Sequence, residues 1–238
     1  ALVQISQRLP LAEQLRSMLS RVQPQGKVNQ LKATWQKSTD GALAYVAHGQ
    51  VRQLSMLRDA LPESPLTNLP GLQAAQVEFD FTQKGGKARV SIQNGSLTLP
   101  LGLDEPFIAL TEASAQLAWQ LKGSDIAVQF TQGRVVNDDL AGEFNGNWKT
   151  GEGQARLPGV LDLTASISRA HVTQVHRYLP NTLPENVRRY VRNAVQSGDA
   201  SKATLRIRGN LRDMPFQNPK QGEFHISAQI AQGKYAYV

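Results

Sequence analysis

The sequence predicts a mainly β fold made of antiparallel strands. Between residues 71 and 167, apolar and polar residues alternate one for one in a succession of short segments. Turn-forming residues separate these segments, and the strands recur about every 8–12 residues, which is typical of antiparallel rather than βαβ folds. Because strand side chains point alternately to two faces, each segment presents one apolar face and one polar face.

The N-terminal part combines one helix with two strands. Residues 10–22 predict an amphipathic helix, since apolar residues recur at helical spacing after Pro10. Residues 28–35 alternate and predict a strand, and residues 42–47 predict a second one. Prolines and a glycine indicate a loop over residues 61–72. The helical apolar residues are Leu11, Leu15, Met18, Leu19 and Val22.

The central region, with the preceding strands, predicts mostly β structure over residues 28–170. Turns are expected at Asn94-Gly95, 122–125, Gln132-Gly133, 137–139 and 150–153. The apolar members of the alternating segments are Ala75, Val77, Phe79, Phe81, Ala88, Val90, Ile92, Leu97, Leu99, Leu101, Leu103, Ala113, Ala115, Leu117, Trp119, Leu121, Ile126, Val128, Phe130, Leu140, Phe144, Trp148, Leu161, Leu163, Ala165 and Ile167.

The pattern changes from period two to helical near Tyr178. A helix is expected over residues 184–197, with Gly198 as its C-cap. Strands return over residues 202–238. Their apolar positions are Ala203, Leu205, Ile207, Phe224, Ile226, Ala228 and Ile230.

Composition narrows the classes of function. The chain has 238 residues, 40% hydrophobic and 19% charged, which is typical of one large or two smaller soluble domains. It has no cysteine, which excludes disulfides and thiolate metal sites. The net charge of +7 favours an acidic partner. The densest basic stretch, Arg188 to Arg212, does not have aromatic residues interleaved as a base-stacking platform needs, and it has no nucleic-acid-binding motif, so nucleic acid is not expected.

No pattern of catalytic residues is present. His171 and His176 are five residues apart, which is the wrong spacing for two metal ligands on one helix face. Asp138 and Asp139 lie in a turn, and there is no nucleophile elbow, phosphate loop or dinucleotide fingerprint. We therefore expect neither an enzyme nor a bound cofactor or metal.

The open question is what covers the apolar faces. Two helices are too few to cover a sheet of about ten strands. The apolar faces then either pack on each other, as in a sandwich or barrel, or line a cavity or groove for an apolar ligand.

The C-terminal third carries a family resemblance. The relevant motifs are Leu157-Pro158-Gly159, Val175 to Pro180, Pro184 to Ala194, and Ala203 to Phe216, followed by Gly222 to Phe224. They resemble the YhdP-type branch of the AsmA-like proteins. The N-terminal part agrees more loosely, at Leu9 to Leu11, Leu31 to Trp35, and Leu69 to Leu72. It departs from the family pattern at residues 73–76, and Tyr190 stands where the family usually has another aromatic residue.

The resemblance implies a bridge-like lipid transfer protein of the Gram-negative envelope. Such proteins are anchored in the inner membrane, cross the periplasm and are thought to carry phospholipids to the outer membrane. The implied fold is a long, curved, twisted antiparallel sheet that forms an open, taco-like groove, with short helices at its ends or edges. Residues 1–238 would form a single elongated module, excised from a longer chain that contacts membranes elsewhere and binds envelope proteins.

The resemblance also implies functional residues. Arg188, Arg189 and Arg192 are expected to contact lipid head groups. Two alternatives stay open: an envelope adaptor that binds proteins through its sheet edges, and a closed β-barrel carrier of one lipophile. The expected groove lining is Val77, Phe79, Phe81, Val90, Ile92, Leu97, Leu99, Leu117, Trp119, Leu121, Val128, Phe130, Phe144, Trp148, Leu161, Leu163, Leu205, Ile207, Phe224 and Ile226.

Overall fold

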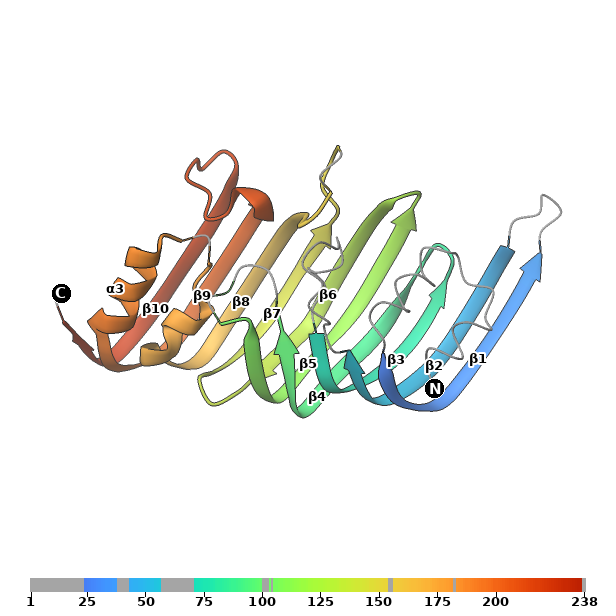
Figure 1. Ribbon diagram of the computed structural model, residues 1–238, viewed down its shortest axis with the longest axis horizontal. Coiled ribbons are helices and arrows are strands. Elements are labelled where there is room, and N and C mark those ends of the chain that lie inside the picture. The colour runs from blue at the N-terminus through green and yellow to red at the C-terminus, as the bar shows by residue number, and fades with distance from the viewer. Residues whose placement is uncertain are drawn as a thin grey trace.

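The computed structural model describes residues 24–37, 43–56, 71–99, 103, 105–153, 156–181 and 183–236. Within these ranges the strands form a single ten-stranded sheet, and their spatial order follows their sequence order (Figure 1). Every neighbouring pair is antiparallel, and β1 and β10 lie at opposite ends of the sheet. The predicted open antiparallel groove is therefore confirmed, and the closed-barrel alternative is wrong.

The strands are long for a globular protein, since strands usually have about 5–6 residues. Their bounds are β1 (Gln25–Lys37), β2 (Leu43–Met56), β3 (Gly71–Thr82), β4 (Gly85–Thr98), β5 (Phe107–Lys122), β6 (Asp125–Val136), β7 (Leu140–Lys149), β8 (Val160–His171), β9 (Val195–Asn210) and β10 (Gly222–Tyr235).

The N-terminal predictions are only partly within the described residues. β1 and β2 extend beyond the strands expected at 28–35 and 42–47. The helix expected at 10–22 lies outside the described residues, as does most of the loop expected at 61–72. The last two residues of that loop, Gly71 and Leu72, begin β3 instead.

Two of the predicted turns are β-bulges inside continuous strands. Asn94-Gly95 lies within β4 and Gln132-Gly133 within β6. Asn94 and Gln132 have φ values of 49° and 50°, which is the left-handed conformation that turn-forming residues tolerate. The same conformation recurs inside four other strands, at Gln53, Ala74, Lys202 and Gln232. Because bulges bend the strands that carry them, we attribute the curvature of the sheet in Figure 1 to this series.

The helical connection between β8 and β9 has two parts. η2 (Val172–Tyr178) is a 3-10 helix that the sequence patterns did not predict, and α3 (Glu185–Ala194) is the expected helix. The expected helix end at residue 197 is wrong, because Val195 already begins β9. Gly198 is therefore a strand residue with φ +131° rather than a C-cap. A short 3-10 turn, η3 (Leu211–Asp213), follows β9.

The most buried hydrophobic residues lie near the bulges. Ala75, Ile92 and Leu110 form a buried cluster from three adjacent strands. Partly buried hydrophobic residues pack around them: Leu54, Leu72, Val77, Leu97, Ile108, Ala113 and Val135. The core is therefore a layer on one face of a single sheet, and the described residues contain no second sheet packed against it.

Candidate functional site

Strand pairing places apolar residues from all ten strands on one face. Residues that pair across neighbouring strands share a face, so the register follows that face from strand to strand. One row takes one residue from each strand, in order, and contains only apolar residues and glycine. This central row is Leu31, Gly49, Phe79, Ala88, Leu117, Phe130, Gly146, Leu163, Ile207 and Phe224.

Two further apolar rows flank the central row. On the side of the β3–β4 and β5–β6 hairpins the row is Ala33, Ala47, Phe81, Gly86, Trp119, Val128, Trp148, Leu161, Gly209 and Gly222. On the other side it is Val51, Val77, Val90 and Ala115, and then Gly133, Phe144, Ala165, Leu205 and Ile226. We call the face with these three rows the apolar face.

The predicted lining residues fall in these rows, with four exceptions. Ile92 and Leu97 belong to the buried cluster instead. Leu121 pairs with Ile126 at the end of a hairpin, and Leu99 follows β4, where its N–H donates to the carbonyl of Pro106. The alternation in the sequence thus identified one face of the sheet. That these residues line a path for a ligand stays a prediction.

The opposite face is polar. The row next to the central row is Lys32, His48, Asp80, Lys87, Ala118, Gln129, Asn147, Asp162, Arg208 and Glu223. Cross-strand ion pairs join His48 to Asp80 and Asp162 to Arg206. The hydrogen bond from Arg206 lowers the pKa of Asp162. This face therefore suits water, in contrast to the other one.

Aromatic rings on the apolar face lie over glycines of the neighbouring strand. A Cβ added at Gly146 would lie 2.6 Å from Cε2 of Phe130, and one at Gly133 would lie 2.5 Å from Cδ2 of Phe144. The two rings are also neighbours, with centroids 6.1 Å apart. A glycine under each ring lets the ring lie against the backbone, so the bulky residues do not project far from the sheet.

A second group of rings lies at the N-terminal end of the face. The centroids of Phe79 and Phe81 are 5.4 Å apart, and Phe81 also contacts Tyr45 and Trp119 at 6.1 and 6.4 Å. Burial raises the pKa of the Tyr45 hydroxyl. Rings at these distances attract one another, which stabilises this part of the apolar face.

A hollow of about 380 Å³ involves mainly the other face. Its polar lining includes Gln129, Asn147 and Asp162, which belong to the polar row. Val128 and Trp148 of the apolar face also contribute atoms to its lining. This hollow is not a pocket along the central row.

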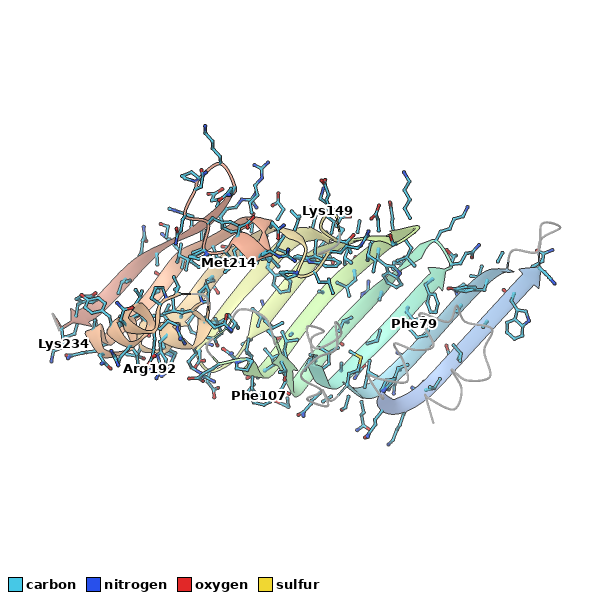
Figure 2. All side chains as sticks on the ribbon, turned by 45° about the horizontal axis from the view of Figure 1, so that its top comes forward. Phe79, Phe107, Lys149, Arg192, Met214 and Lys234 are labelled. Carbon is cyan, nitrogen blue, oxygen red and sulfur yellow. The ribbon has the colours of Figure 1, made fainter. Side chains whose placement is uncertain are left out.

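The arginines expected at head groups lie on α3. Arg189 and Arg192 are exposed, and Arg188 is half-buried with its Nε donating to the carbonyl of Leu183 at 3.1 Å. On the side of α3 that faces the sheet, Ala194 at the end of the helix is fully buried. Helix α3 therefore presents positive charge to solvent beside the apolar face (Figure 2).

Sequence reasoning missed a polar cluster at one rim of the sheet. The guanidinium of Arg177 donates to Glu105 at 2.8 Å through Nε and to Asp139 at 2.6 Å through Nη1. The Tyr178 hydroxyl donates to Asp139 at 2.8 Å and accepts from Asn137 at 2.9 Å. Burial raises the pKa of Tyr178 to about 12. Asp139 was read only as a turn residue, because local patterns do not reveal partners 38 positions away.

Two absences apply to the described ranges. They contain no group of three or more His, Cys, Asp or Glu residues arranged to hold a metal ion. None of their helices combines the length and the apolar character needed to span a bilayer.

Comparison with known proteins gives one match. A family model described as YhdP protein matches residues 1–238. No curated protein and no solved structure matches the chain.

Proposed function

Because this chain belongs to the YhdP family, we propose that it forms one stretch of a path that carries phospholipids between the inner and outer membranes of a Gram-negative bacterium. In this proposal the module lies in the periplasm and belongs to a longer protein anchored in the inner membrane. The family is associated with envelope lipid transport, which agrees with this assignment. The acyl tails lie on the apolar face, and the head groups remain in water.

The observation that supports the proposal is the central row. It crosses all ten strands without a polar side chain, in the direction perpendicular to the strands. A buried methylene group contributes about 0.8 kcal/mol, so transfer of one long acyl chain into water costs on the order of 10 kcal/mol. A continuous apolar row removes most of that cost at every step along the sheet.

The shape of the lining also suits the passage of lipids rather than the tight binding of one lipid. Rings laid over Gly133 and Gly146 keep the apolar face low, and the lining of the hollow described above includes no residue of the central row. A deep specific pocket would hold a lipid and slow its passage. The device needs no catalytic group and no cofactor.

We assign the exposed arginines of α3 to the lipid head groups. Arg189 and Arg192 are exposed on a helix beside the apolar face. Basic residues near an anionic lipid surface contribute about 1 kcal/mol each. They would therefore favour anionic phospholipids without binding them tightly.

The sheet edges support a second candidate function, an adaptor that binds envelope proteins. β1 and β10 end the sheet, and they expose Trp35, Ile230 and Tyr235 by 55%, 58% and 55%. Exposed strand edges are templates for pairing with another chain. This function uses the edges, whereas lipid transfer uses the face between them.

Native mass spectrometry of the full-length protein, purified from cells without detergent, separates the two functions. Lipid transfer predicts co-purified phospholipid in several species, and loss of that lipid in a variant with Val128→Asp on the apolar face. The matched control is Gln129→Asp on the polar face. Protein that carries no phospholipid but retains a stoichiometric protein partner would favour the adaptor.

A further inference from the structure

The connection between β8 and β9, residues 172–194, folds back over the apolar face. A Cβ added at Gly198 would lie 3.1 Å from Cγ2 of Val172 and equally close to Cγ2 of Ile230. Ile230 pairs with Ala200, and Ala200 pairs with Ala170 on the apolar face. Val172 therefore packs on this face, and Figure 1 shows η2 and α3 in front of β8 to β10. We call residues 172–194 the cover.

The residues beneath the cover are small. Ala200 and Ala203 are only 5% and 4% exposed. By contrast, Ile226 and Ile230 on the adjacent strand β10 are 49% and 58% exposed on the same face. Small side chains leave room for the cover, and the cover takes the volume that larger side chains fill elsewhere on the sheet.

One end of the cover is fastened to two other connections. Arg177 joins Glu105 in the β4–β5 connection to Asp139 in the β6–β7 connection. Leu103 forms a bridge with Pro180, whose side chain is fully buried. The Asp139 side chain is only 11% exposed, so loss of its partners would leave a charge poorly solvated. These contacts hold η2 at the edge of the sheet where the β4–β5 and β6–β7 connections lie.

The other end of the cover has few buried side chains. Most of α3 is exposed, and Ala194 is its one buried residue. The hydroxyls of Tyr190 and Tyr235 meet at 3.0 Å in an exposed position. A segment with few buried contacts opens at a low free-energy cost once its fastening is removed.

We propose that Arg177 is a positioning residue that holds the cover on the apolar face, and that the cover confines the lipid path at β8–β10 to the part of the face around Leu163 and Phe224. The second half of this statement rests on the proposed lipid-transfer function, whereas the first half does not. With the cover in place, acyl tails pass over Leu163 and Phe224. They do not reach Ala200 or Ala203.

Cysteine labelling tests the fastening without any lipid. Residues 1–238 contain no cysteine. Once any cysteines elsewhere in the full-length protein are replaced by serine, Ala203→Cys is a single reporter beneath the cover. We expect slow maleimide labelling in the full-length protein, and an increase of about tenfold or more when Arg177→Ala is added. Arg177→Lys should give an intermediate rate, because it keeps the charge and loses the two-sided contact. Thr204→Cys, on the opposite face, is the control and should label equally in every background.

Two labelling results would overturn the fastening. One is unchanged protection of Ala203→Cys in Arg177→Ala. The other is an equal rise in labelling at Ile92→Cys, in the buried cluster, because that would mean that Arg177 stabilises the whole sheet.

Photo-crosslinking tests the path. A crosslinker at Phe224 should capture phospholipid in the wild type, and one at Ala200 should do so only with Arg177→Ala. Capture at Ala200 in the wild type would overturn the confined path and leave lipid transfer intact. Absence of capture at every position would instead count against the proposed function itself.

Discussion

Strands β3–β7 and strands β8–β10 belong to one sheet but complete their apolar face in different ways. In β3–β7 the face is made by large side chains, among them Phe79, Trp119 and Phe130. In β8–β10 part of the face is Ala170, Ala200 and Ala203, and the connection between β8 and β9 lies on top. Among the described residues, no helix packs on the apolar face of the first region, whereas the cover packs on that of the second.

The difference shows two solutions to the same physical problem. A single sheet with one apolar face must cover that face with its own chain or leave it for another molecule. In β6 and β7 the rings of Phe130 and Phe144 lie against glycines of the neighbouring strand, so they do not project far from the sheet. Near the C-terminal end of the sheet the chain covers part of the face and leaves Ile226 and Ile230 exposed.

The largest expected effect comes from a charge in the central row. Leu163→Glu should reduce the phospholipid that co-purifies with the protein by about tenfold or more, because a carboxylate among acyl tails costs several kcal/mol. Native mass spectrometry measures the bound lipid. The module should still fold, since Leu163 is only partly buried.

The matched control for this variant is Ser166→Glu, at an exposed position on the polar face of the same strand. It should leave the bound lipid unchanged. Equal losses in both variants would mean that the two faces do not differ in function, and the comparison would fail.

The second expected effect concerns only the covered region. Arg177→Ala should lower the free energy of unfolding by about 2 kcal/mol, because it leaves Asp139 with one donor fewer in a poorly hydrated position. Arg134→Ala is the control: its ion pair with Glu112 is about half exposed on both sides, and its loss should cost at most about 0.5 kcal/mol. Urea unfolding measures both changes in the free energy of unfolding. Equal changes would show that the cluster around Arg177 stabilises the fold no more than an exposed ion pair does.

The third expected effect concerns the apolar face of β3–β7. Gly146→Ala should cost about 2 kcal/mol, since the new Cβ would lie 2.6 Å from the Phe130 ring and closer still to the backbone carbonyl oxygen of Asp162, so both the ring and the neighbouring strand must shift. Asn147→Ala, at the next and exposed position, should change the stability by less than about 0.5 kcal/mol. A neutral Gly146→Ala would show that the ring does not depend on the glycine beneath it.

The smallest expected effect is a pH dependence at the cover. The folded pKa of Tyr178, about 12, lies above its ordinary value of 10.0, because burial favours the neutral phenol. Its contribution to stability is therefore complete below pH 10 and is lost as the pH rises from about 10 to about 12. Partial exposure limits this contribution to about 1 kcal/mol. Tyr178→Phe should remove it, and identical alkaline unfolding profiles for the two proteins would contradict the assignment.

The sequence predicted the strands well because alternation is a local signal. A one-residue change of register would turn Phe79 and Val77 to the other face, so the pattern specifies the face strongly. The open sheet followed from the family resemblance rather than from alternation, which is equally compatible with a sandwich or barrel. The structure decides between them, since β1 and β10 do not pair.

Other features escaped prediction for identifiable physical reasons. Asn94-Gly95 has the composition of a hairpin turn, but the strand continues because it pairs on both sides with β3 and β5. The helical pattern continued through Val195, but Val195 pairs with Tyr235 and belongs to β9. Because Tyr235 is far along the chain, no local pattern indicates this pairing. The link of Arg177 to Glu105 spans 72 positions, and no local pattern encodes it.

A crosslinking scan along one strand tests the central claim most directly. A photo-crosslinker is placed in turn at each residue from Leu161 to Ile167 in the full-length protein in cells, and the captured phospholipid is measured. The account predicts capture that alternates along the strand, high at Leu161, Leu163 and Ala165 and low at Asp162, Thr164 and Ser166. Capture at Ile167 should also be low, because its partner Ala203 lies beneath the cover. Capture without alternation, or capture on the polar side, would contradict it.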